Sequence, residues 1–90
     1  MSMDTRIRER LETAFSPSLL EVLNESHLHA GHAGSPNSGQ SHFRVHIVSE
    51  KFFGCSRVER HRLVNEALSR ELADGVHALA IKAEAPGQGR

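Results

Sequence analysis

The hydrophobic positions in the first half of the chain predict one helix and two strands. In residues 4–15 apolar side chains recur every three or four positions, which places them on one face of a helix. In residues 19–26 and again in 43–47 they alternate with polar side chains, a pattern typical of strands with one buried face. Between the strands, residues 27–41 are rich in Gly and Ser, so a flexible loop is predicted there.

The second half of the chain predicts a helical stretch followed by a last strand. Ser56 and Glu59 have the spacing of a capping box, so a helix should run from about residue 56 to residue 73. Its apolar stripe is expected to begin at Val58. A strand is predicted over residues 76–83, and the remaining C-terminal residues 85–90 read as a tail.

These elements predict a single α+β domain over residues 1–90, with an ordered core at about residues 4–84. Consecutive strands pair most simply in the antiparallel sense, whereas a strand–helix–strand unit is nearly always parallel and right-handed. We therefore expect a three-stranded mixed sheet covered by helices. A break in the second helical stretch near residues 52–56 gives the order α-β-β-α-α-β.

The predicted topology brings histidines to one end of the sheet. A parallel last strand begins where the second strand begins, so His77 is expected at the base of the loop that carries His27, His29 and His32. Neutral imidazole is a common ligand of iron, zinc and copper, so either a metal site or a solvated loop fits this placement. Cys55 is expected at the other end of the sheet, about 25 Å from His77.

The composition excludes several classes of protein. The 11 Lys and Arg balance the 11 Asp and Glu, so any attraction to nucleic acid must be local. A single cysteine cannot form an internal disulfide, nor can it alone hold an iron–sulfur cluster. No signal peptide or membrane-spanning run is evident, and no nucleophile is paired with a base. We expect a cytoplasmic, non-enzymatic protein with no membrane partner.

A local basic segment is a candidate contact for nucleic acid. Lys51, Arg57, Arg60 and Arg62 surround the start of the second helical stretch, with Glu59 as the one acidic residue among them. Such a segment could contact the backbone of double-stranded DNA in a salt-sensitive, weakly specific way. A solvated helix face is the alternative interpretation.

Short motifs spread over residues 7–83 resemble the BolA family. The main ones are Asn24-Glu25-Ser26, Ser41-His42-Phe43, Phe53-Gly54, Arg60-His61-Arg62 and Val76-His77-Ala78-Leu79. The resemblance implies a fold similar to class II KH domains. It also implies partnership with a monothiol glutaredoxin and glutathione in holding a shared two-iron two-sulfur cluster, with no cofactor expected in the isolated chain.

The resemblance also suggests which residues would act. His77 occupies the position of the fixed cluster ligand and His29 that of the loop ligand, with His32 as an alternative in the same loop. Imidazole in place of thiolate would raise the reduction potential of the cluster and make the complex labile in acid. The second family role is that of a DNA-binding transcriptional regulator of stress and morphology responses. We expect a monomer or a weak homodimer.

Overall fold

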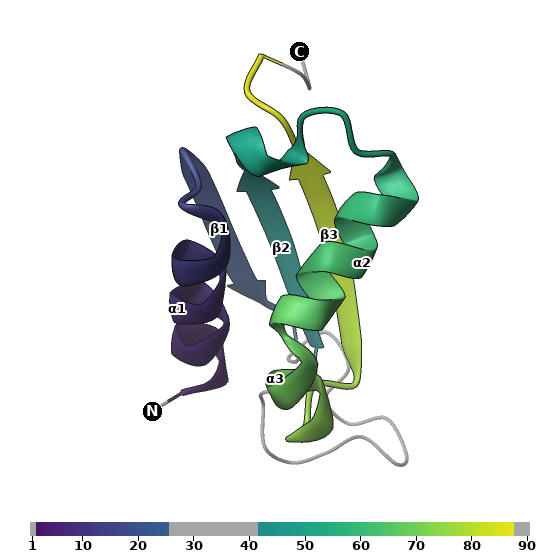
Figure 1. Ribbon diagram of the computed structural model, residues 1–90. Helices are drawn as coiled ribbons and strands as arrows, with labels where there is room; N and C mark the ends of the chain where they lie inside the picture. Colours follow the sequence, from purple (N-terminus) through teal and green to yellow (C-terminus); the bar gives the residue numbers. More distant parts are fainter. Residues whose placement is uncertain (1, 26–41, 88–90) are drawn as a thin grey trace.

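The computed structural model describes residues 2–25 and 42–87 (Figure 1). The elements are α1 (Met3–Phe15), β1 (Leu19–Asn24), β2 (His42–Val48), the 3-10 helix η2 (Glu50–Phe52), α2 (Arg57–Ala67), α3 (Ser69–Ala73) and β3 (Ala78–Glu84). The α+β class and the order α-β-β-α-α-β are thus confirmed. The break between the two α-helical pieces lies at Leu68, so its predicted position near residues 52–56 is wrong: residues 53–56 connect η2 to α2.

The sheet has the mixed pairing that the sequence predicts. Its strand order is β1-β2-β3. β1 runs antiparallel to β2, with Asn24 opposite Phe43, and β2 runs parallel to β3, with His42 opposite Ala78. As a result, the end of β1 and the starts of β2 and β3 lie together at one end of the sheet.

Both long helices cover the same face of the sheet (Figure 1). Phe43, Val45 and Ile47 alternate along β2 and are buried on that face, where they pack with apolar residues of α1 such as Ile7 and Leu11. This alternation is the period of two that defines which side of a strand is covered. The other face of the sheet carries the polar side chains of β2, among them Arg44 and His46.

Some boundaries and burial assignments differ from the sequence prediction. β3 begins at Ala78, two residues later than predicted, because its pairing with β2 begins only where β2 itself begins, at His42. Val58 is 66% exposed, so the predicted apolar stripe is wrong there. Ala85 is fully buried although it was expected to open the tail.

The predicted loop over residues 27–41 lies outside the described residues, as do positions 88–90 of the predicted tail. Within the described part of the chain, no helix has the length and apolar character that crossing a bilayer requires.

Candidate functional site

His77 is exposed at one end of the sheet, immediately before β3. The chain turns into β3 at Gly75, whose φ of 140° lies in a region that favours glycine, and the next residue, Val76, is buried. Because Ala78 pairs with His42, His77 lies beside the start of β2. The local backbone therefore anchors His77 on both sides while its side chain remains accessible.

The segment that carries His29 and His32 is attached at this same end of the sheet. The backbone N–H of Glu25 donates to the carbonyl oxygen of His42 at 2.8 Å, which fixes the end of β1 against the start of β2. The two histidines themselves lie outside the described residues, so their role stays a prediction. What the structure does define is the two attachment points at this end of the sheet: the start of β2, next to His77, and the end of β1, one strand further away.

Cys55 lies toward the opposite end of the sheet, as expected. It precedes α2, and its Sγ is 3.8 Å from the carbonyl oxygen of Lys51, a weak hydrogen bond for a thiol. In residues 2–25 and 42–87, no group of three His, Cys, Asp or Glu side chains has an arrangement that could hold a metal ion. A metal at His77 would therefore need ligands from outside the described residues.

The four cations of the basic segment have different surroundings. Arg60 donates from Nε to the carbonyl oxygen of Cys55 at 3.0 Å and from Nη1 to that of Ala83 at 3.1 Å. The Nζ of Lys51 donates to the carbonyl oxygen of Ala14 at 3.0 Å. Arg57 and Arg62 are exposed. Two of these cations therefore hold the fold together, and the other two extend toward solvent.

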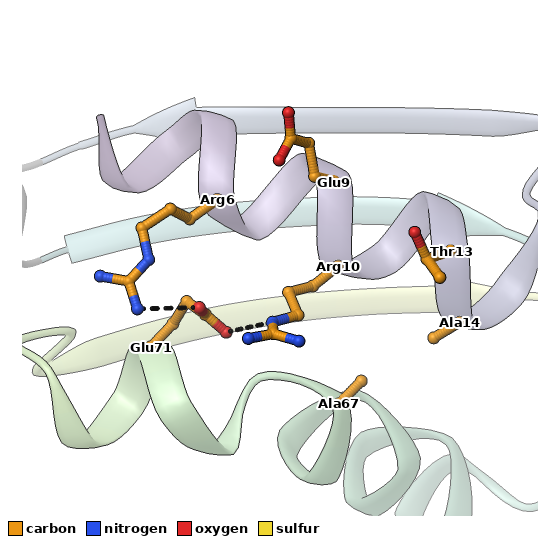
Figure 2. A pocket seen from close by; sticks show the side chains of 7 residues that line it. All are labelled: Arg6, Glu9, Arg10, Thr13, Ala14, Ala67 and Glu71. Carbon is orange, nitrogen blue, oxygen red and sulfur yellow. Dashed lines mark ion pairs between the residues drawn. The ribbon is translucent and has the colours of Figure 1, made fainter. Parts of the chain in front are cut away.

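A second polar cluster, which sequence reasoning missed, joins α1 to α3 (Figure 2). Glu71 is 1% exposed, and its two carboxylate oxygens lie 3.1 Å from Arg6 and 3.4 Å from Arg10. Arg6 also donates to Asp74 at 2.6 Å, and this hydrogen bond raises the pKa of Arg6. The sequence holds one sign of this cluster: Glu71 lies seven residues after the buried Val64, at the spacing of the apolar stripe of the predicted helical stretch.

A histidine on the uncovered face of the sheet bridges all three strands. The Nε2 of His46 is 2.6 Å from Glu84 on β3, and its Nδ1 is 3.3 Å from Glu21 on β1. The alternation over residues 43–47 places His46 on the face opposite Val45, but it indicates no partner for it. In the structure both partners are carboxylates of the neighbouring strands, so cross-strand pairing explains the presence of a histidine at this position.

Comparison with known proteins identifies the family of this fold. The family model described as "BolA-like protein" matches residues 11–88. BolA-like protein 1 of the mouse, Mus musculus, is 54% identical over 88 residues, which are 98% of this chain and 61% of the mouse protein. The chain thus spans less than two thirds of that relative. We conclude that it belongs to the BolA family, as its motifs indicated.

Two further relatives connect the family to structure and to DNA. The solved BolA domain of SufE1 from Arabidopsis thaliana is 45% identical, with a TM-score of 0.88 over 99% of this chain and 98% of that one. A Vibrio cholerae protein named DNA-binding transcriptional regulator BolA is 48% identical over 75 residues, 83% of this chain and 67% of that protein. The first of these matches shows that nearly the whole chain has the fold of a BolA domain.

Proposed function

We propose that this chain is a non-enzymatic partner of a monothiol glutaredoxin in the assembly, transfer or sensing of a two-iron two-sulfur cluster. His77 would supply the fixed ligand from this chain, and His29, or His32 in its place, would supply the ligand from the segment before β2. The observation that carries the proposal is the exposed position of His77 beside the start of β2, at the end of the sheet where that segment is attached to β1 and β2.

The cysteine and histidine side chains of this chain suit a cluster shared with another protein better than a cluster held by this chain alone. Iron–sulfur clusters are held mainly by cysteine thiolates, with histidine as the known substitute. The single cysteine, Cys55, lies near the other end of β3, whereas His77 is accessible next to the start of that strand. A cluster here would have to draw its thiolates from the glutaredoxin and from glutathione.

The residues of this chain would hold and release the cluster rather than carry out a reaction. When bound, the cluster supplies reversible one-electron chemistry, and imidazole ligands make it less negatively charged than an all-thiolate set does. The backbone on either side of His77 is held by the turn at Gly75 and by the pairing of Ala78 with His42. The backbone position from which the imidazole extends is therefore defined. Protonation of an imidazole nitrogen removes its ligand lone pair, so acid would favour release.

The ligand role can be tested with spectroscopy on the mixed complex. The protein is added to a cluster-loaded monothiol glutaredoxin in the presence of glutathione, and visible absorption and circular dichroism are recorded. We expect new bands with the natural chain that are lost with His77→Ala. The matched control is His61→Ala, which removes a partly exposed histidine from α2 and should leave the bands unchanged. Identical spectra for the natural chain and His77→Ala would reject the ligand role.

A second candidate function is binding of double-stranded DNA as a transcriptional regulator. It is favoured by the name of the Vibrio cholerae relative and by the exposure of Arg57 and Arg62. Replacing both arginines by glutamine should weaken retardation of a duplex and flatten the dependence of binding on salt. An unchanged salt slope would show that this face of α2 does not contact DNA.

A further inference from the structure

A cleft of about 420 Å³ lies between the start of α2 and the end of β3. Both elements contribute to its lining, which includes four cationic or ionisable basic side chains, a thiol and one carboxylate. The polar members are Cys55, Arg57, Arg60, His61, Lys82 and Glu84. Arg57 and Arg60, two of the four cations of the basic segment, line this cleft. His61 of the same helix and Lys82 of β3 line it with them.

Positive charge in this cleft exceeds negative charge. Glu84 is the single carboxylate among the lining residues, and it already has partners outside the helix. One of its oxygens is 2.6 Å from Nε2 of His46 and 3.9 Å from Nζ of Lys82. The carboxylate of Glu84 is therefore already paired with His46 and Lys82, and within the described residues no ion pair joins it to the arginines of α2.

The two arginines that line the cleft, Arg57 and Arg60, differ in how firmly their side chains are held. Arg60 is fixed in place, because its Nε and Nη1 donate to the carbonyl oxygens of Cys55 and Ala83. Those acceptors are neutral, so the guanidinium keeps its full positive charge beside the cleft. Arg57 is exposed, and its guanidinium has no ion pair within residues 2–25 and 42–87. One fixed and one adaptable cation therefore border the same hollow.

We propose that this cleft binds the phosphate group of a small phosphorylated molecule. Guanidinium groups match the oxygens of a phosphate with pairs of parallel hydrogen bonds, and the ammonium of Lys82, which is 3.9 Å from Glu84, adds a point charge from β3. The cations converge from a helix and a strand into a hollow, which suits a compact dianion. The same phosphate chemistry is present in DNA, so the experiment must separate the two sources.

The proposed site is separate from the ligand position at His77. The cleft borders residues 81–84 of β3, whereas His77 precedes the first residue of that strand. The six residue-to-residue steps from Ala78 to Glu84 span about 20 Å of extended chain. Phosphate binding can therefore be tested independently of glutaredoxin, and failure of one proposal does not decide the other.

The test is a titration of the full chain with inorganic phosphate and with adenosine 5′-monophosphate, at constant ionic strength, followed by amide shifts in nuclear magnetic resonance spectra. We expect saturable shifts at Arg57 and Lys82. Arg57→Gln and Lys82→Gln should each weaken binding by about tenfold, the loss of one charged hydrogen bond. Arg62→Gln, an exposed arginine of α2 outside the cleft, is the matched control and should change affinity by less than about twofold. His77→Ala should have no effect.

Three outcomes would overturn the proposal. Shifts that grow linearly without saturation would indicate diffuse attraction only. An equal effect of Arg62→Gln would show that general surface charge, and not this cleft, attracts the anion. Binding of a DNA duplex without binding of the mononucleotide would assign the same cations to the nucleic-acid backbone. Spectra of each variant report folding directly, so a loss of binding through unfolding is recognised.

Discussion

The guanidinium of Arg60 donates a hydrogen bond from Nη1 to the carbonyl oxygen of Ala83 at 3.1 Å. The next carbonyl, that of Glu84, accepts from the backbone N–H of Ser49, on the side of β2. Successive carbonyls of a strand point in opposite directions, so the carbonyl of Ala83 points to the outer edge of β3. Arg60 thus covers an edge acceptor that would otherwise be open to another strand.

Arg60→Met should lower the free energy of unfolding by about 1–3 kcal/mol, because two backbone carbonyls lose a charged donor. The methionine keeps most of the aliphatic packing, so the loss reports mainly on hydrogen bonds. Chemical denaturation followed by circular dichroism measures it. Arg62→Met, at an exposed position of the same helix, should stay within about 0.5 kcal/mol of the natural chain. Equal losses in the two variants would contradict the structural role of Arg60.

Truncation of two neighbouring phenylalanines should cost very different amounts of stability. Phe52 is fully buried with its ring centroid 5.0 Å from that of Phe15, whereas Phe53 is 55% exposed. Phe52→Ala should therefore cost about 3–5 kcal/mol through lost burial and a cavity. Phe53→Ala should cost less than about 1 kcal/mol. Thermal or urea denaturation of the pair provides the measurement, and similar midpoints would show that the burial assignment is wrong.

Stability should depend more on the buried carboxylate of Glu71 than on the exposed carboxylate of Glu9. Glu71→Gln removes the charge that faces Arg6 and Arg10, both of which remain partly solvated, so we expect a loss of about 1–3 kcal/mol in stability. Glu9 lines the pocket between α1 and α3 together with Glu71, but its side chain is exposed (Figure 2), so Glu9→Gln should be nearly neutral. A chemical denaturation series tests the pair. A neutral Glu71→Gln would mean that the ion pairs contribute no net stability.

The capping box at the start of α2 should make part of the stability depend on acid. The backbone N–H of Ser56 donates to Glu59 at 3.1 Å, and this bond lowers the pKa of Glu59. A lowered pKa in the folded state means stability that is fully present above the ordinary glutamate pKa and is lost as pH falls through the folded value. The stability difference between the natural chain and Glu59→Gln should therefore be constant near neutrality and shrink below about pH 4.

Ser56→Ala separates the two halves of this cap. It removes the hydroxyl that accepts from the N–H of Glu59 at 3.1 Å, at a cost of about 1 kcal/mol. It leaves the backbone N–H of Ser56, which is the larger cause of the lowered pKa of Glu59, so most of the acid-dependent part should persist. Stability measured from pH 7 to pH 3 checks both variants. An acid-dependent difference that disappears in Ser56→Ala would assign the effect to the hydroxyl instead.

The topology was predictable because it follows from local periodicity and from general rules of chain connection. Alternation around Phe43 defined β2, and the preference for parallel crossovers then placed His77 at the correct end of the sheet. The capping box likewise fixed the start of α2 within a residue. These inferences need only neighbours in sequence and the handedness of strand–helix–strand units.

Tertiary partners were not predictable in the same way. The sequence does not distinguish Phe52 from Phe53, because burial depends on how η2 packs against α1. Nor does it separate Arg60 from Arg62, since the difference is a carbonyl of β3 that is distant along the chain. Periodicity describes a helix face, whereas these roles depend on what lies opposite that face.

If the proposed shared cluster forms, its reduction potential should depend on the donor at position 77. If His77 is a ligand, His77→Cys replaces a neutral donor by an anionic thiolate and should lower the potential, by an amount on the order of 100 mV. A redox titration of the complex with glutaredoxin, followed by visible circular dichroism, measures the shift. His61→Cys adds a thiol elsewhere on the surface and should leave the potential unchanged. A complex that forms normally with His77→Cys at an unaltered potential would show that the imidazole of His77 does not reach the iron.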